Sequence, residues 1–189
     1  MESLIDCATA YKKFYQIEQK SLFHTTCSCI TSQQVSFNVG RTIRKQLYDL
    51  CGVPLTRESI LNADLTQIKN LTPNRIKLLK DMAKIDDNES NDKVLTNYYK
   101  LKGFGKWTHN AISILLGLSD TVNLSTDLYI RKNLAIYLSK PKLTEKEAYD
   151  YLLQANNNQT IVCHFLWRIK PTSVHKVITE LVLTKDDFV

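Results

Sequence analysis

Apolar residues recur every three or four positions along much of this chain. The first clear run consists of Val39, Ile43, Leu47 and Leu50. Similar runs occupy residues 76–83 and 111–116. This spacing gathers apolar side chains on one face of a helix, whereas strands alternate every second residue. The pattern predicts about ten helices and no sheet, which makes the chain all-α.

Local signals predict where several of these helices begin and end. Thr72-Pro73 places proline in a first helical turn, and Thr144 stands three residues before Glu147 as in a capping box. Breaks are expected at residues 52–54, 86–92, 102–105 and 140–141. The polar stretch over residues 85–92 fits a solvated loop better than a boundary between lobes.

Composition narrows the class of protein. The chain has 189 residues, 43% of them hydrophobic, with only 5 Gly and 4 Pro, which disfavours a turn-rich sandwich or barrel. It shows neither a secretory signal nor an apolar stretch long enough for a membrane span. The five cysteines are scattered and odd in number, so we expect a reducing, intracellular compartment and small buried thiols.

The charge balance points weakly to a polyanionic partner. Lys and Arg total 25 against 19 acidic residues, a formal net charge of +6. An excess of this size suits nucleic acid, but it also occurs on ordinary basic surfaces. The cysteines lack the spacing of a zinc site or an iron–sulfur cluster, so neither cofactor is expected.

The most informative segment is the stretch LKGFGKW at residues 101–107, between two predicted helices. Gly103 and Gly105 allow a sharp turn and a close approach of a partner to the backbone. The helix start that follows offers free N–H groups to a phosphate, with Lys102 and Lys106 beside it. A plain corner between two helices, with glycine as a C-cap, explains the segment equally well.

An aspartate follows this segment at a fixed distance. Asp127 lies 22 residues after Gly105 and directly precedes a predicted helix over residues 128–138. Aspartate is a preferred N-cap, so capping alone accounts for it when it is considered in isolation.

Three blocks together make the chain resemble a known family. The hairpin pattern L-x-G-[IVF]-G-x-W-T is matched by residues 101–108, D-x-x-[IL]-[RK] by residues 127–131, and I-x-x-Q-Q-[VI]-S by residues 30–36. In this order they resemble the helix–hairpin–helix base-excision DNA glycosylases, above all the alkylated-base branch, 3-methyladenine DNA glycosylase II. The resemblance covers about residues 22–167.

The resemblance implies a fold and a domain plan. We expect a single all-α, two-lobed glycosylase domain over residues 1–189, with the active cleft between the lobes. One lobe spans about residues 22–100, the hairpin occupies residues 99–107, and the other lobe combines the N-terminal segment with residues 108–189.

The resemblance also assigns roles to named residues. Asp127 becomes the catalytic carboxylate, a role that can coexist with capping. The expected walls of the base pocket are Trp107, Trp167, Phe23 and Tyr129, although core packing explains either tryptophan as well. The expected wedge and DNA contacts are Gln33, Gln34, Ser36, Lys102, Gly103, Phe104, Gly105, Lys106 and Thr108, and the choice of wedge between Gln33 and Gln34 stays open.

Two further expectations concern chemistry and ions. Bifunctional members of the family carry a Schiff-base lysine two residues after the second hairpin glycine, a position that Trp107 occupies here. The resemblance therefore implies a monofunctional enzyme. It also allows a monovalent cation, Na⁺ or K⁺, on the carbonyls of Tyr99, Leu101 and Phe104.

The expected function is hydrolytic release of alkylated purines, of the 3-methyladenine type, from duplex DNA by a monomer that acts wherever the cell keeps its DNA. Three alternatives remain: the same fold acting on deaminated or mismatched bases, an enzyme that also nicks the abasic strand, and a noncatalytic helix–hairpin–helix DNA-binding module.

Overall fold

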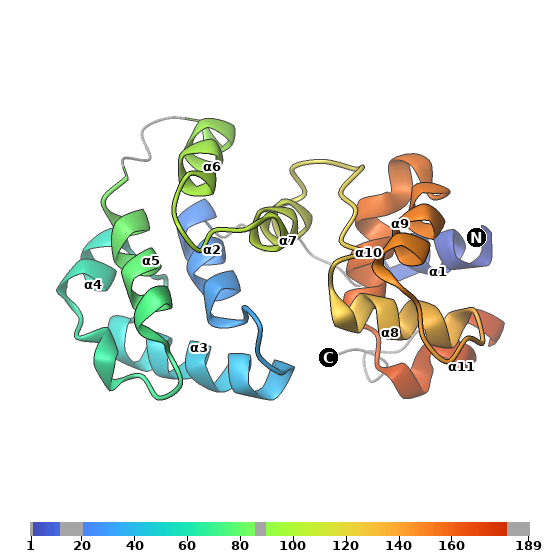
Figure 1. Ribbon diagram of the computed structural model, residues 1–189, viewed down its shortest axis with the longest axis horizontal. Coiled ribbons are helices and arrows are strands. Elements are labelled where there is room, and N and C mark those ends of the chain that lie inside the picture. Colours follow the sequence, from blue (N-terminus) through green and yellow to red (C-terminus); the bar gives the residue numbers. More distant parts are fainter. Residues whose placement is uncertain (1, 12–20, 86–89, 181–189) are drawn as a thin grey trace. The chain divides into compact units, whose positions relative to one another are not determined.

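The computed structural model describes residues 2–11, 21–85 and 90–180, and over these ranges the chain is helical without any strand (Figure 1). Its α-helices are α1 (Glu2–Tyr11), α2 (Leu22–Thr31), α3 (Phe37–Cys51), α4 (Arg57–Asn62), α5 (Pro73–Ala83), α6 (Asn91–Tyr99), α7 (Lys106–Leu116), α8 (Leu128–Tyr137), α9 (Glu145–Leu153), α10 (Gln159–Arg168) and α11 (Val174–Glu180). Three short 3₁₀ helices cover Leu65–Gln67, Asn156–Asn158 and Pro171–Ser173. The predicted all-α class is confirmed.

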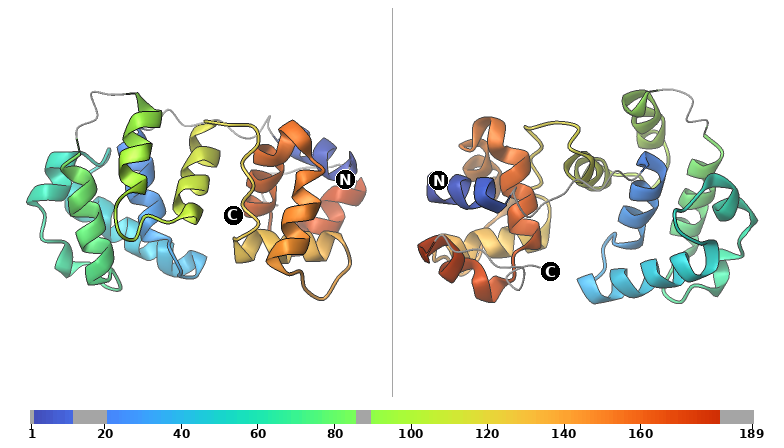
Figure 2. Two further views of the ribbon diagram at one scale, coloured as in Figure 1. Left: turned by 45° about the horizontal axis from the view of Figure 1, so that its top comes forward. Right: turned by 180° about the vertical axis from the view of Figure 1, so that it is seen from behind.

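The chain divides into two compact units. One unit combines Met1–Glu18 with Ser113–Val189, and the other contains Gln19–Ile112. The first unit is discontinuous in sequence, because α1 packs against α10 and α11 (Figure 2). The second unit contains α2 to α6 and the first part of α7.

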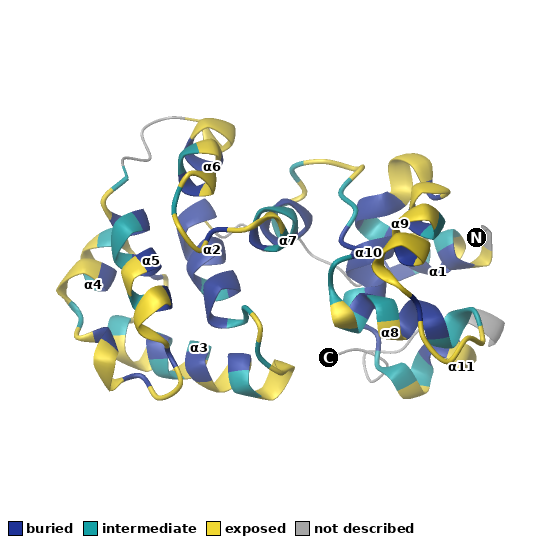
Figure 3. Cartoon of the chain, in the orientation of Figure 1, coloured by how far each residue is buried: buried dark blue, intermediate teal, exposed yellow. Residues whose placement is uncertain are grey.

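The second unit is built around α2. Nine of its ten residues are buried, since α3 and α5 both contact it (Figure 3). Ser21 caps the helix by accepting a hydrogen bond from the His24 N–H. A helix can be buried on all sides when its side chains are apolar or when its polar side chains are hydrogen-bonded within the helix. This explains why α2 lacks the one-sided spacing that makes α3 easy to predict.

Helix α10 has the same place in the first unit. It contacts α1, α8 and α9, and most of its length is buried. Phe165 and Leu166 are fully buried there, as are Ile130 and Leu134 of α8. The packing of α8 on α10 helps to fix the position of Asp127, which immediately precedes α8.

The predicted helix ends are largely correct. Pro73 is the first residue of α5, and Thr144 and Glu147 form the expected reciprocal capping box at α9. One boundary was wrong: α6 already begins at Asn91, so the polar loop is shorter than residues 85–92. Residues 86–89 of that loop lie outside the described residues, and α5 and α6 belong to the same compact unit.

Four cysteines are core residues, as predicted, and Cys51 is half-buried. Burial raises the pKa of the Cys29 thiol to about 12. In the described part of the chain, we find no helix with both the length and the apolar character that a membrane crossing requires.

Candidate active site

Asp127 is the N-cap of α8. Its Oδ1 accepts hydrogen bonds from the N–H groups of Tyr129 at 2.8 Å and Ile130 at 3.1 Å. Its own N–H donates to the Leu124 carbonyl, and its carbonyl accepts from the Arg131 N–H. Both the main chain and one carboxylate oxygen are therefore fixed, while the residue keeps partial exposure. The predicted capping role is confirmed.

The loop that leads to Asp127 is tied to α10. Thr160 Oγ1 donates to the Ser119 carbonyl at 2.6 Å and accepts from the Val122 N–H at 2.9 Å. The Thr160 N–H donates to the Asp120 carbonyl. The hydroxyl and the backbone N–H of Thr160 thus bond to three residues of the loop, which limits how far Asp127 can move.

Cys163 of α10 lies beneath the same loop. Its Sγ accepts a hydrogen bond from the Leu124 N–H at 3.5 Å. Burial is the main cause that raises the pKa of this thiol to about 12; the Leu124 hydrogen bond opposes it, and the negative charge of Asp127 adds to it. The Cys163 side chain is therefore a neutral thiol under Asp127, with no role as a nucleophile at neutral pH.

Asn133 joins α8 to the C-terminal end of α10. It is fully buried, and its Nδ2 donates to the carbonyls of Leu166 and Ile169, both at 2.8 Å. Tyr129 Oη donates to the Ile169 carbonyl at 3.3 Å. Asn133 was not predicted from the sequence. The available signal was an amide on the apolar face of a helix, but its partners lie more than 30 residues away in the sequence.

These bonds flank one of the predicted pocket residues. Trp167 lies between Leu166 and Ile169 and is half-buried. Tyr129 is also half-buried, and burial raises its pKa. The structure thus brings Asp127, Tyr129 and Trp167 onto two helices that contact each other within one compact unit.

The hairpin between α6 and α7 belongs to the other unit. Gly103 has φ +97°, a left-handed conformation that glycine adopts without strain, and the Phe104 N–H closes the turn on the Leu101 carbonyl at 3.0 Å. Gly105 has no positive φ, and a Cβ placed on it meets no described atom within 4 Å. Lys102 and Lys106 are exposed beside it.

Phe104 requires a correction. We expected it among the DNA contacts, but its side chain is only 4% exposed. Its ring packs against those of Tyr98 and Tyr99, with centroids 6.0 and 6.5 Å away. The aromatic side chain therefore anchors the hairpin from inside, and only its backbone remains available to a ligand.

Gln33 lies in the turn between α2 and α3 and reaches the hairpin. Its Nε2 donates to Thr108 Oγ1 at 2.7 Å and to the Gly103 carbonyl at 3.2 Å. Its carbonyl accepts a hydrogen bond from Nη2 of Arg75, a side chain only 9% exposed. The amide of Gln33 is therefore engaged within the unit and links this turn to the hairpin.

Gln34, the next residue, lies in a different environment from Gln33. It is exposed, and its backbone has φ +50°, which is uncommon for a residue with a side chain. Ser36 follows and caps α3 by accepting from the Val39 N–H at 3.5 Å. Gln34 is therefore the member of the pair whose side chain points to solvent from a rigid turn.

Two other expected contacts are corrected by burial. Thr108 is 2% exposed and its hydroxyl accepts from Gln33, so its side chain holds Gln33 from inside the unit. Phe23 is 4% exposed, and the Arg57 guanidinium covers its ring at 4.9 Å from the centroid. Phe23 is thus a core ring of its unit, whereas Trp107, in the first turn of α7, is half-buried.

The possible ion sites are limited. The Leu101 carbonyl accepts the hairpin's own hydrogen bond from Phe104, and it keeps a second lone pair for a cation. The cation on the carbonyls of Tyr99, Leu101 and Phe104 stays a prediction. Within the described ranges, no group of three His, Cys, Asp or Glu side chains converges as metal ligands would.

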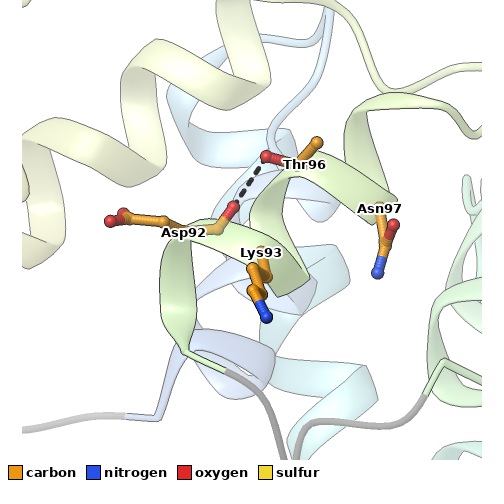
Figure 4. A pocket seen from close by; sticks show the side chains of 4 residues that line it. All are labelled: Asp92, Lys93, Thr96 and Asn97. Atoms are coloured by element: carbon orange, nitrogen blue, oxygen red, sulfur yellow. Dashed lines mark hydrogen bonds between the residues drawn. The ribbon is translucent and has the colours of Figure 1, made fainter.

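A surface hollow of about 360 Å³ lies on α6, lined by Asp92, Lys93, Thr96 and Asn97 (Figure 4). Thr96 Oγ1 donates to the Asp92 carbonyl at 2.7 Å, a bond within one turn of the helix. All four residues come from a single helix and none belongs to the blocks described above, so this hollow carries no functional argument.

No protein-family model matches the chain, and no curated protein matches its sequence. Solved structures do resemble it. A 3-methyladenine DNA glycosylase from Schizosaccharomyces pombe, in complex with abasic DNA, superposes with a TM-score of 0.70 at 18% identity, over 88% of this chain and 95% of that one. A 3-methyladenine DNA glycosylase from Archaeoglobus fulgidus superposes with a TM-score of 0.67 at 16% identity.

The match to the Archaeoglobus enzyme covers 86% of this chain but only 60% of the other protein. The likeness extends over both compact units at an identity too low for ordinary sequence comparison. The chain therefore has the all-helical fold of these DNA glycosylases, and the fold implied by the three sequence blocks is confirmed.

Proposed function

We propose that this chain is a monofunctional DNA glycosylase that hydrolyses the N-glycosidic bond of alkylated purines, of the 3-methyladenine type, in duplex DNA. The observation that carries the proposal is Asp127, a carboxylate held at the start of α8 by two backbone N–H groups in a fold shared with such enzymes.

The chemistry needs a fixed anion near the sugar. As the base departs, positive charge develops on the sugar ring, in an oxocarbenium-like transition state. A carboxylate that is already oriented stabilises that charge without reorganising during the reaction. Both capping bonds go to Oδ1 of Asp127. The same carboxylate can therefore orient the attacking water while it caps α8.

An alkylated purine needs an electron-rich pocket. Such a base is cationic, and an aromatic face attracts a cation by about 0.5–2 kcal/mol. Trp167 is partly exposed at the end of α10, and Asn133 fixes the backbone on both sides of it. Tyr129, two residues after Asp127, supports the same wall.

The base must leave the helix before the bond can be cut. Everting a nucleotide costs a few kcal/mol and leaves a gap beside the orphaned base. Gln34 suits the wedge role, because its amide is exposed on a turn held by its neighbours. Gln33 does not, since its amide already binds Thr108 and the Gly103 carbonyl.

The hairpin supplies the contact to the DNA backbone. A helix N-terminus attracts phosphate through its free N–H groups, and the first turn of α7 follows Gly105 directly. Because nothing crowds Gly105, a phosphate can approach the main chain there. Lys102 and Lys106 add exposed positive charge, so this contact reads no sequence.

The partner is duplex DNA that contains a damaged base, the acting species is a monomer, and the chain works where the cell keeps its DNA. Water is the nucleophile, because Trp107 stands where a lyase carries its lysine. The product is therefore a free base and an intact strand with an abasic site.

A base-release assay on methylated DNA tests the proposal. Asn caps a helix as well as Asp, so Asp127→Asn keeps the cap and removes the charge. We expect this variant to lose at least about 100-fold in release rate, the scale of a lost transition-state electrostatic contact. Its melting temperature and its affinity for an abasic duplex should stay near those of the wild type.

Asp120→Asn is the matched control, since Asp120 is exposed in the same loop and its carbonyl accepts a hydrogen bond from the Thr160 N–H. Equal release by Asp127→Asn and the wild type would overturn the mechanism. Release of deaminated bases instead of methylated purines would replace the substrate class. Binding to DNA with no release from any lesion would favour a noncatalytic DNA-binding module.

A further inference from the structure

The first turn of α3 carries a half-exposed aromatic side chain, Phe37. Phe37 is 48% exposed at the first position of the helix, directly after its cap, Ser36. Figure 3 shows this end of α3 as exposed surface. The exposed part of this ring adds no buried area to the fold, so its face is accessible to a ligand.

The ring is held close to the Gln34 turn. Gly40, one turn after Phe37, is buried against Ser32, and a Cβ there would lie 3.0 Å from Ser32 Oγ and 3.2 Å from Ser32 Cα. The absence of a side chain at Gly40 therefore lets α3 lie against the segment that leads into Gln33 and Gln34. Phe37 thus begins a helix that packs on this segment, and it follows the exposed Gln34 by three residues.

The charge beside the ring is positive. Arg41 is exposed one turn further along the same face of α3, at the i, i+4 spacing that brings side chains together. Asp49 is the only acidic residue in the helix, and it pairs with Lys45 at 2.6 Å. No ion pair of Arg41 occurs among the residues that the structure describes.

We propose that Phe37 and Arg41 form a second DNA contact beside the Gln34 turn, in which the Phe37 ring stacks on a nucleobase and Arg41 binds a phosphate. An aromatic ring next to an exposed cation is a combination that binds unstacked bases, because every base has a π-face and every nucleotide a phosphate. A self-association surface would not need the cation.

This inference rests on the proposed function for its choice of DNA. The contact acts on the base left unpaired or on a base of the neighbouring step, after the damaged nucleotide has left the stack. It therefore favours DNA that is already distorted. Undamaged duplex, whose bases are stacked, offers the ring less to hold.

Fluorescence anisotropy on two duplexes tests this contact. One duplex carries a stable abasic-site analogue and the other is undamaged. Stacking contributes about 1–3 kcal/mol per base, so Phe37→Ala should weaken binding to the abasic duplex by about 5- to 150-fold. Phe37→Trp should restore it and Phe37→Leu should not. The melting temperature should not change, because the ring is exposed.

Leu50→Ala is the matched control, since Leu50 is 39% exposed on the same helix but near its other end. Its affinity should equal that of the wild type. Arg41→Gln should weaken binding to both duplexes and reduce the slope of log affinity against log salt by about 0.9, one phosphate contact.

The inference is overturned if Phe37→Ala binds the abasic duplex like the wild type, if Phe37→Leu restores binding, or if Leu50→Ala loses as much. It is also overturned if sedimentation shows that Phe37→Ala abolishes a dimer while DNA affinity is kept. Base release by the wild type is measured on the same preparations. A chain that binds through Phe37 and releases no base would refute the proposed function and leave this contact standing.

Discussion

The side-chain amide of Gln33 donates a hydrogen bond of 2.7 Å to Thr108 Oγ1, a residue 75 positions further along the chain. A second bond from the same nitrogen reaches the Gly103 carbonyl at 3.2 Å. The turn that ends α2 and the glycine hairpin that begins α7 are therefore one hydrogen-bonded assembly. If both touch DNA, a phosphate bound at the hairpin fixes the position of Gln34.

This arrangement predicts opposite phenotypes for two adjacent glutamines. Gln33→Ala leaves a buried hydroxyl and a carbonyl without their donor, so we expect a loss of about 1–3 kcal/mol in the free energy of unfolding. Gln34→Ala should leave stability unchanged and lower the rate of base release. Thermal melts together with release assays on both variants separate the two roles.

Thr108→Val provides the control for the buried bond. It should destabilise the chain less when Gln33 is already Ala, because the two side chains share one interaction. If Gln34→Ala released bases at the wild-type rate, while Gln33→Ala lost activity without losing stability, the wedge would belong to Gln33.

The hairpin glycines should also behave differently from each other. Gly103 has φ +97°, so Gly103→Ala strains the turn, at a cost of about 1–3 kcal/mol in stability. Gly105 has neither a positive φ nor a close neighbour, so Gly105→Ala should fold as well as the wild type. A methyl group there nevertheless hinders an approaching phosphate. DNA affinity should fall, and by the same factor for every sequence tested.

Equal DNA affinity of Gly105→Ala and the wild type would mean that the phosphate contact lies elsewhere. Sequence-dependent loss would mean that the hairpin reads bases. Either outcome is measured with undamaged duplexes of different sequence, so it does not depend on catalysis.

Much of this architecture follows from local sequence. Pro73 marks a helix start through its fixed φ and its missing N–H. The Thr144–Glu147 capping box and the Asp127 cap do so through bonds between residues two or three positions apart. Such bonds need no knowledge of tertiary structure. The glycines similarly predict the hairpin. A turn with positive φ favours glycine, and Gly103 has such a φ.

Residue roles that depend on tertiary packing could not be derived this way. A motif position does not reveal whether a residue acts through its backbone or its side chain, so Phe104 and Thr108 were expected at the surface and are buried. Phe23 meets Arg57 from a different helix. The role of Asn133 as a donor to two backbone carbonyls is visible only when α10 is packed against α8.

His164 makes stability depend on pH. It is 2% exposed, stacked on Tyr11 with centroids 5.5 Å apart, and burial, helped by the charge of Arg168, lowers its pKa to about 3. Its unfolded pKa is about 6.5. At a pH between these two pKa values, His164 is protonated in the unfolded chain and neutral in the folded chain. Stability is therefore complete above pH 6.5 and falls as pH drops toward 3.

One proton corresponds to a slope of about 1.4 kcal/mol per pH unit at most. His164→Phe keeps a ring against Tyr11 and removes the titration. We expect its free energy of unfolding, from urea melts between pH 7.5 and 5.0, to vary less with pH than that of the wild type. His175→Phe, an exposed histidine on α11, is the control. Parallel pH profiles for the wild type and His164→Phe would contradict the assignment.

The last prediction concerns the fate of the abasic strand. A lyase forms a Schiff base between a lysine and the sugar, which borohydride reduces to a permanent adduct. Here Trp107 occupies the position of that lysine, and Lys106 is an exposed residue at the first position of α7, about 100° away around the helix. Incubation with abasic DNA and borohydride should therefore give no covalent adduct, and the strand should stay intact.

Lys106→Gln should release methylated bases at the wild-type rate under saturating DNA, with a modest loss of affinity that shrinks as salt rises. An adduct that forms with the wild type and disappears in Lys106→Gln would show instead that Lys106 reaches the sugar, and water would no longer be the nucleophile.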